Sequence, residues 1–238
     1  MGAVAPGLLW LAASRVLIAA DVHLAYEDVI GGALPTWSTA ETTATLVLAA
    51  RALGAHEIVL LGDIIHGSLM SEGAARDVAQ ALQALRAECA LTLVVGNHEG
   101  RTRGAAVLGE TVENVTREGW LLLHGDKPAA SGVRAIIGHL HPSLHMTGAG
   151  ATPAFVAGPR VVVVPALTPY STGLDICSDA FVHALRSFDV TRADLHVVAV
   201  AGDRVFPFGT LSTLKKTIAR PGRSGPRDRF RRRFLRPD

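Results

Sequence analysis

The sequence predicts an α/β fold, a four-layer αββα sandwich in which two mixed β-sheets pack face to face between outer helices. Two observations lead to this prediction. In the first 95 residues, short apolar runs alternate with segments of helical character, which is the pattern of parallel β-α-β units. Beyond residue 100, short apolar runs follow one another with Gly and Pro between them, which is typical of antiparallel or mixed sheets.

The amino-terminal half is expected to form one sheet with two covering helices. Strands are predicted at residues 8–11, 15–20, 58–61 and 91–95, and helices at residues 40–53 and 71–88. Ser38 or Thr39 is expected to cap the first helix and Gly54 to end it. Residues 26–37 contain Gly and Pro without periodicity, so we predict a loop there.

The carboxyl-terminal half is expected to be rich in strands. We predict them at residues 111–115, 120–124, 134–137, 153–156, 160–164, 195–200 and 204–207. A short helix is predicted at residues 178–187. Together these elements form one compact domain, residues 1–214.

Residues 215–238 form a basic tail. They contain ten Lys or Arg and two Asp, a net charge of +8, whereas the rest of the chain carries 13 basic and 19 acidic residues. The tail has too little apolar surface to pack and is expected to be disordered. Either it is a nucleic-acid arm, with Phe230 and Phe234 stacking on bases, or it is a solvated tail.

Neither export nor a membrane is indicated. The first residues lack the positive charge of a signal peptide, and the apolar run at residues 8–13 is too short to cross a bilayer. Cys89 and Cys177 do not make a disulfide framework. We therefore expect a cytoplasmic protein without membrane contact.

Polar residues follow five predicted strands at the point where each strand stops. Side chains in such positions are held at the mouth of a sheet, where catalytic groups usually lie. They are Asp21, His23, Asp63, Asn97, His124, His139 and His141. Oxygen and imidazole ligands suit Mn, Fe and Zn, and seven are too many for one ion. Two divalent ions that share Asp63 would use all seven.

Paired ions of this kind lie about 3.5–4 Å apart and stabilise a displacement at phosphorus, while a water that bridges them becomes hydroxide near neutral pH. We expect Mn²⁺, with Fe or Zn as alternatives. Each motif alone is a weak signal, because Asp-x-His and strand-end histidines also occur without metal. Their joint occurrence in one chain favours a metal centre.

These motifs resemble those of the calcineurin-like metallophosphoesterases. They are Asp21-x-His23, Gly62-Asp63, Gly96-Asn97-His98-Glu99, His124 and Gly138-His139-x-His141. The finer resemblance is to the bacterial ligase-associated metallophosphoesterases of the DNA-damage response and to related archaeal phosphoesterases. It depends on residues 21–24, 138–142 and 165–173.

The resemblance implies a role for each residue. Asp21, His23 and His141 would hold the first ion with Asp63. Asn97, His124 and His139 would hold the second ion, again with Asp63. His98 would protonate the leaving oxygen, and His66 would contact the phosphate. The resemblance also implies the αββα fold and a functional association with a DNA ligase or helicase.

The chain departs from the ligase-associated enzymes at two places. Glu99 stands where many of them have Asp, and either residue would orient His98. After Leu24 the chain continues Ala25-Tyr26-Glu27, where they usually have Gly-Lys, so a cation near the substrate entrance is missing.

Three further residues are candidates for substrate binding. Arg101 and Arg103 follow the Asn97-His98 turn and either contact phosphate or are solvated loop charges. Trp37 either stacks on a base or sugar or packs in front of a helix.

We therefore predict a two-metal phosphoesterase that uses a metal-bridging hydroxide, acting as a phosphodiesterase or nuclease on DNA or RNA in repair. An alternative is a small-molecule phosphodiesterase or phosphatase for a cyclic nucleotide, nucleotide-sugar or phosphomonoester, which the acidic body favours. A second alternative, a nucleic-acid-binding partner protein with a secondary metal site, is disfavoured by the complete ligand set.

Overall fold

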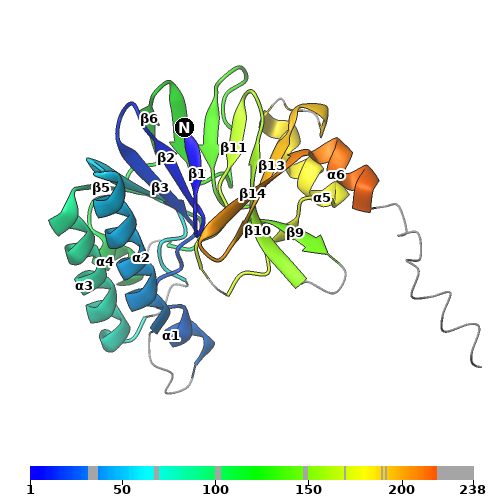
Figure 1. The fold of residues 1–238 in the computed structure, drawn as a ribbon. Coiled ribbons are helices and arrows are strands. Elements are labelled where there is room, and N and C mark those ends of the chain that lie inside the picture. The colour runs from blue at the N-terminus through cyan, green and yellow to red at the C-terminus, as the bar shows by residue number, and fades with distance from the viewer. Residues whose placement is uncertain are drawn as a thin grey trace, which may run out of the picture.

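The fold is a sandwich of two sheets with helices on both outer faces (Figure 1). The computed structural model describes residues 1–31, 37–66, 70–99, 103–146, 150–168, 170–188, 190 and 192–218. This arrangement confirms the predicted α/β four-layer architecture. Among the described residues, no helix is long and apolar enough to cross a membrane.

The first sheet has five strands in sequence order. They are β1 (Gly2–Val4), β2 (Leu8–Leu11), β3 (Val16–Ala20), β4 (Glu57–Leu61) and β5 (Ala90–Val94). β1, β2 and β3 pair antiparallel, whereas β3, β4 and β5 pair parallel. The parallel strands end at the same edge of the sheet, so the residues that follow them meet there.

Helices cover the outer face of this sheet (Figure 1). They are α2 (Trp37–Leu53), α3 (Glu72–Glu88) and α4 (Arg103–Leu108), whereas α1 (Tyr26–Ile30) lies past the lower end of α2. Ser71 caps α3, because its hydroxyl accepts a hydrogen bond from the backbone N–H of Ala74 at 3.1 Å. Gly54 follows α2 with a left-handed φ of 61°.

The prediction of a loop over residues 26–37 was wrong at both ends of that range. α1 occupies its first five residues, and α2 begins at Trp37. Ser38 and Thr39 therefore lie inside α2 and do not cap it. Their hydroxyls make tertiary contacts instead: Ser38 Oγ donates to Glu27 at 2.7 Å, and Thr39 Oγ1 accepts from Ala25 N at 2.8 Å. A local sequence pattern does not reveal these partners.

The second sheet has nine strands. They are β6 (Asn114–Arg117), β7 (Trp120–Leu123), β8 (Ala135–Ile137), β9 (Pro142–Met146), β10 (Gly150–Ala157), β11 (Val161–Val163), β12 (Leu174–Asp175), β13 (His196–Ala201) and β14 (Arg204–Thr210). β7, β8 and β11 are parallel neighbours. The outer face carries α5 (Asp179–Ala184), α6 (Leu211–Ile218) and two 3₁₀ segments, Leu185–Phe188 and Arg192–Asp194.

Several elements differ from those predicted. β1, β9, α4 and α6 were not predicted, and β6 begins at Asn114 and not at residue 111. The predicted boundary between domain and tail, at residues 214 and 215, falls inside α6. Residues 219–238, which include most of the predicted tail, lie outside the described residues.

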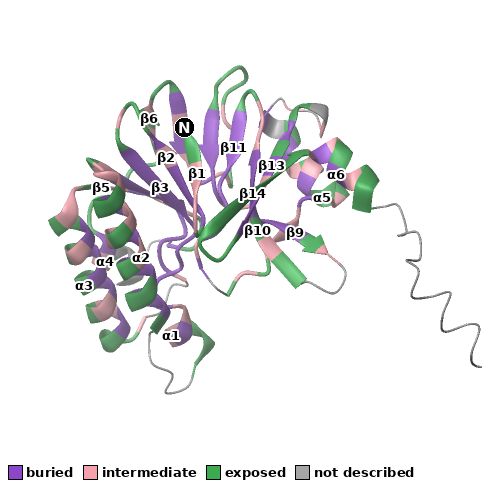
Figure 2. Cartoon of the chain, viewed as in Figure 1, coloured by how far each residue is buried: buried purple, intermediate pink, exposed green. Residues whose placement is uncertain are grey.

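Three apolar layers hold the sandwich together, and the buried strands lie between the helices (Figure 2). β3 shows how one strand serves two of these layers. Leu17 and Ala19 pack toward the helices, whereas Val16, Ile18 and Ala20 pack against the second sheet. Because side chains alternate along a strand, a strand buried on both faces reads as a continuous apolar run. The polar residues that follow β3 therefore stand out from the apolar run before them in the sequence.

Candidate metal centre

The strands that lead into the site end in sharp backbone turns. Five of the seven predicted metal ligands take left-handed φ values: Asp21 (49°), His23 (43°), Asp63 (42°), His139 (61°) and His141 (43°). This conformation is uncommon for residues other than Gly and costs of order 1–3 kcal/mol for each residue. Strain at this density is typical of a functional site and is maintained only where the surrounding structure enforces it.

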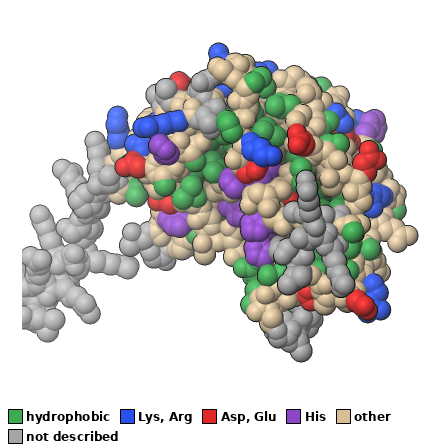
Figure 3. All heavy atoms as spheres, turned by 180° about the vertical axis from the view of Figure 1, so that it is seen from behind, with side chains coloured by type: hydrophobic (Ala, Val, Ile, Leu, Met, Phe, Trp, Pro, Cys, Tyr) green, Lys and Arg blue, Asp and Glu red, His purple; other side chains and the backbone are tan. Residues whose placement is uncertain are grey.

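The seven residues meet in two adjoining clusters. Ligand atoms of Asp21, His23, Asp63 and His141 lie within 4.8 Å of one another, and so do those of Asp63, His124 and His139. Asp63 belongs to both clusters. Asn97 joins the second cluster, because its Oδ1 lies 2.9 Å from His124 Nε2. Figure 3 shows histidine side chains gathered on one face of the molecule.

The Asp21 carboxylate shows what the first cluster requires. Its Oδ2 accepts a hydrogen bond from the backbone N–H of His139 at 2.9 Å. Its Oδ1 is buried without a hydrogen-bond partner, and His141 Nε2 lies 3.4 Å away. A buried carboxylate oxygen with no partner is costly, and a bound cation removes that cost. The residues present therefore fit a divalent metal ion.

Two imidazoles of the site, those of His23 and His139, are held in the neutral form that binds metal. Burial, reinforced by the neighbouring imidazoles of His141 and His66, lowers the pKa of His23 to about 3. Burial and His124 also lower the pKa of His139. Burial acts to lower the pKa of His141 as well, but the Asp21 and Asp63 carboxylates raise it above its usual value.

Two glycines are required because backbone and carboxylates approach closely. A Cβ at Gly138 would lie 2.5 Å from Asp21 Oδ2 and 2.8 Å from the Ala20 Cβ. A Cβ at Gly96 would lie 2.3 Å from Asp63 Oδ1 and 2.2 Å from its backbone nitrogen. No side chain fits at these distances, so both strand-end motifs need Gly before their polar residue.

Glu99 ties together the loops that follow β4 and β5. Its buried carboxylate accepts hydrogen bonds from Gly96 N, at 2.5 Å, and from Ile64 N. Burial raises the pKa of Glu99. Asp63 Oδ1 adds a further tie by accepting from the backbone N–H of His98 at 3.1 Å. These bonds fix the backbone on both sides of Asp63.

Ser171 supports the site, a role that none of the sequence motifs indicated. Its Oγ lies 2.6 Å from His141 Nδ1, which leaves Nε2 of that ring toward Asp21. Metal-ligating histidines are usually oriented by such a bond on their other ring nitrogen. Ser171 is 30 residues from His141 in the chain, so only the fold brings them together.

His98 and His66 lie beside the first cluster. His98 Nε2 is 3.7 Å from Asp63 Oδ2, and its side chain is 41% exposed. The rings of His66 and His98 are stacked, with centroids 5.1 Å apart. His66 Nδ1 lies 3.1 Å from His23 Nδ1. Both histidines are thus next to the first ligand cluster.

The three candidate substrate-binding residues are placed differently. Arg101 lies outside the described residues, and Arg103 opens α4, although its side chain is not described. Trp37 is 73% exposed and lines a groove of about 560 Å³ between α2 and α3, together with Thr43 and Ala81. A role for these residues in substrate binding stays a prediction.

Comparison with known proteins places this geometry in a family. Residues 14–150 match the family of calcineurin-like phosphoesterases, and the chain belongs to that family. It is a phosphoric ester hydrolase with a His/Asp metal-binding site. The crystal structure of Pseudomonas putida nuclease MPE matches with a TM-score of 0.65 and 23% sequence identity, covering 86% of this chain and 93% of that chain. A search of curated proteins found no match.

Replacement of Gly138 by Ala tests the close packing of the site. We expect Gly138→Ala to displace Asp21 and to lower the metal content of the purified protein by more than half. Gly73→Ala is the matched control, since the nearest atom to its added Cβ is 3.8 Å away. Elemental analysis of both variants measures the effect, and normal metal content in Gly138→Ala would contradict the geometry.

The low pKa of His23 predicts how the metal-free protein responds to pH. The unfolded chain binds a proton at His23 near pH 6.5, whereas the folded chain does so only near pH 3. The stabilising contribution is therefore complete above pH 6.5 and is lost as pH falls toward 3, by up to about 1.4 kcal/mol per pH unit. Urea unfolding in EDTA at pH 7, 6 and 5 should show a smaller pH slope for His23→Gln.

The control is His183→Gln on α5, an exposed histidine outside the site. Its slope should equal that of the unsubstituted protein. Equal slopes for all three proteins would show that His23 is not held neutral by the fold.

Proposed function

We propose that the chain is a two-metal phosphodiesterase that cleaves nucleic acid, as the nucleases of DNA repair do. The observation that carries the metal half of this proposal is the shared position of Asp63 in both ligand clusters. A carboxylate between two ligand sets is the arrangement that two neighbouring divalent ions require.

The proposed ligands divide between the clusters. Asp21, His23 and His141 hold one ion with Asp63, and Asn97, His124 and His139 hold the other with Asp63. We expect Mn²⁺, which accepts this mixture of oxygen and nitrogen donors. When bound, two such ions lower the pKa of water and neutralise the charge that develops at phosphorus.

His98 is the proposed general acid. Its side chain is 41% exposed while its backbone N–H is bonded to Asp63, so it is positioned without being buried. It donates a proton to the leaving oxygen of the ester. His66 stacks on His98, and burial lowers the pKa of His66. A neutral His66 retains one N–H, which we assign to a substrate phosphate oxygen.

Nucleic acid is the proposed substrate for three reasons. The structurally similar Pseudomonas putida protein is a nuclease, and the motifs resemble those of ligase-associated enzymes. The tail at residues 220–238 adds eight Arg to a body that is otherwise acidic, and guanidinium groups bind phosphates. An association with a DNA ligase or helicase belongs to the same proposal.

The acidic body supports a second candidate. Residues 1–214 carry 19 Asp or Glu against 13 Lys or Arg, a balance that repels a long polyanion. A small phosphodiester or phosphomonoester would not be affected in the same way. The two candidate functions use the same metal centre. They differ in the size of the group that the substrate phosphate carries.

Substitution of His98 tests its role as general acid. His98→Ala should lower kcat for a dinucleotide by about 10²–10⁴-fold. The loss should be much smaller for bis-p-nitrophenyl phosphate, because nitrophenolate leaves without needing a proton. Metal content should stay unchanged, and His183→Ala should behave as the unsubstituted enzyme. Full dinucleotide activity in His98→Ala would exclude the role.

Removal of residues 220–238 tests the nucleic-acid arm. The truncated protein should bind single-stranded DNA more weakly at low salt, and its affinity should depend less steeply on salt. Its KM for bis-p-nitrophenyl phosphate should not change. A full-length variant with the eight tail Arg replaced by Ser separates charge from length. Unchanged DNA affinity in both proteins would favour the small-molecule candidate.

A further inference from the structure

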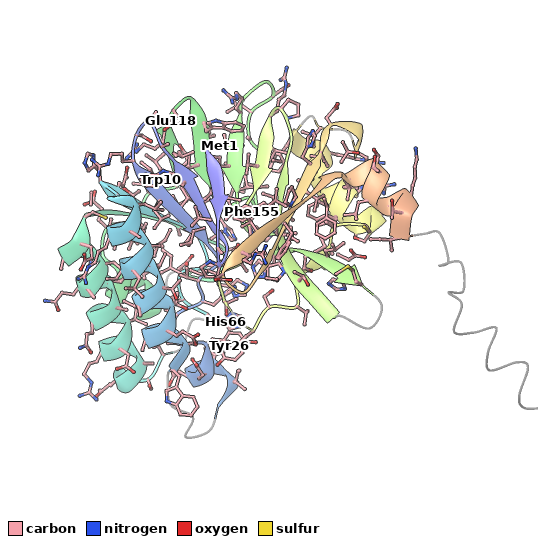
Figure 4. All side chains as sticks on the ribbon, in the orientation of Figure 1. Met1, Trp10, Tyr26, His66, Glu118 and Phe155 are labelled. Atoms are coloured by element: carbon pink, nitrogen blue, oxygen red, sulfur yellow. The ribbon has the colours of Figure 1, made fainter. Side chains whose placement is uncertain are left out.

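A row of aromatic rings leads from the metal centre to the surface. His98 stacks on His66, and the His66 ring lies 4.5 Å from the ring of Tyr26. Tyr26 in turn stacks on Tyr170, with centroids 4.6 Å apart and ring planes 11° from parallel. Figure 4 shows Tyr26 and His66 next to each other, at the end of the sandwich opposite Met1 and Glu118. We call the Tyr26–Tyr170 pair the aromatic shelf.

Glu27 holds the shelf in place. The Tyr170 hydroxyl donates to Glu27 Oε1 at 2.9 Å. Glu27 is 4% exposed and also accepts hydrogen bonds from Ser38 N at 2.9 Å and Ser38 Oγ at 2.7 Å. The carboxylate thus joins α1, the start of α2 and the loop at residues 170–173. Tyr170 is fixed at its hydroxyl and on one face.

The backbone in front of Tyr26 is also fixed. Ala25 precedes α1 in a left-handed conformation with φ 57°. Its N–H donates to Thr39 Oγ1 at 2.8 Å, so the strained residue is anchored. A strained, anchored residue in front of Tyr26 sets where that ring points. The shelf therefore has the rigidity that a binding surface needs.

The outer side of the shelf remains open among the described residues. Tyr170 is 43% exposed, although one of its faces lies on Tyr26 and its hydroxyl is bonded to Glu27. Exposed aromatic rings offer planar apolar surface at little entropic cost, and bases stack on them. The next residue, Ser171, orients the metal-cluster histidine His141. One short segment thus connects the shelf to the site of chemistry.

We propose that the aromatic shelf binds the base of a nucleoside whose sugar carries the scissile phosphate. Nucleoside phosphates are then the substrate class. The proposal rests on the proposed phosphoesterase function, because the phosphate must lie at the metal centre. A purely structural stack would need Glu27 and the hydroxyl of Tyr170, but it would not need an exposed Tyr170 ring that is joined through Tyr26 to His66.

The test compares two deoxyribose phosphates, of which only one carries a base. Thymidine 5′-monophosphate and 2-deoxyribose 5-phosphate are titrated into the full chain loaded with Mn²⁺, and Kd is measured by calorimetry. Stacking of one base should make the nucleotide bind about 5- to 100-fold more tightly. Tyr170→Leu removes the ring, whereas Tyr170→Phe keeps the ring and loses the hydrogen bond to Glu27.

The expected result is a clear preference for the nucleotide in the unsubstituted protein and in Tyr170→Phe, and its loss in Tyr170→Leu. Equal Kd values for the two phosphates in the unsubstituted protein would overturn the proposal without any variant. The proposal would also be overturned if Tyr170→Leu raised the Kd of both phosphates by the same factor.

The outcome is separate from that of the proposed function. Base preference in a protein that hydrolyses no diester would support the shelf and refute the phosphodiesterase. Hydrolysis of bis-p-nitrophenyl phosphate without base preference would support the phosphodiesterase and refute the shelf.

Discussion

Asp63 connects more parts of the site than any other residue described above. Its carboxylate belongs to both ligand clusters, and its Oδ1 accepts from the His98 backbone. Its own carbonyl accepts from the N–H of His23 at 3.0 Å, which joins the turn after β3 to the turn after β4. Gly96, which follows β5, lies so close to Asp63 that no Cβ fits between the two residues. The ends of three parallel strands are thus fixed relative to one carboxylate.

This arrangement places several features that destabilise the metal-free fold close together. Left-handed backbone at Asp21, His23 and Asp63, a buried carboxylate oxygen without a partner, and closely spaced imidazoles all raise the energy of the metal-free fold. The apolar layers on both sides of each sheet supply the stability that tolerates this cost. Bound cations would relieve part of the strain, so we expect metal and folding stability to be linked.

Much of the fold and of the metal centre could be predicted from local sequence. Apolar runs that stop at a polar residue marked β3, β4, β5 and β8, and Gly precedes that residue after β4, β5 and β8. Parallel pairing brought the ends of β3, β4 and β5 together. The family match covers this region. The ligand assignment itself, which the family resemblance implies, stays a prediction.

Other features were beyond sequence analysis because they depend on distant contacts. Glu27 and Tyr170 are 143 residues apart, and no motif indicates that their side chains meet. β9 was missed because Pro142, Ser143 and His145 interrupt its apolar pattern. α1 was missed because five residues next to Gly do not establish a period, and its anchor, Thr39, was interpreted as a helix cap. In each case a tertiary contact and not a local propensity determined the structure.

The most direct test of the account is a titration of Mn²⁺ into metal-free protein, with bound metal and hydrolysis of bis-p-nitrophenyl phosphate measured on the same samples. We expect two ions per chain, diester hydrolysis that requires both, and loss of hydrolysis together with at least one ion in Asp63→Ala. Full activity with a single ion per chain, or undiminished activity in Asp63→Ala, would contradict a two-metal centre built on this carboxylate.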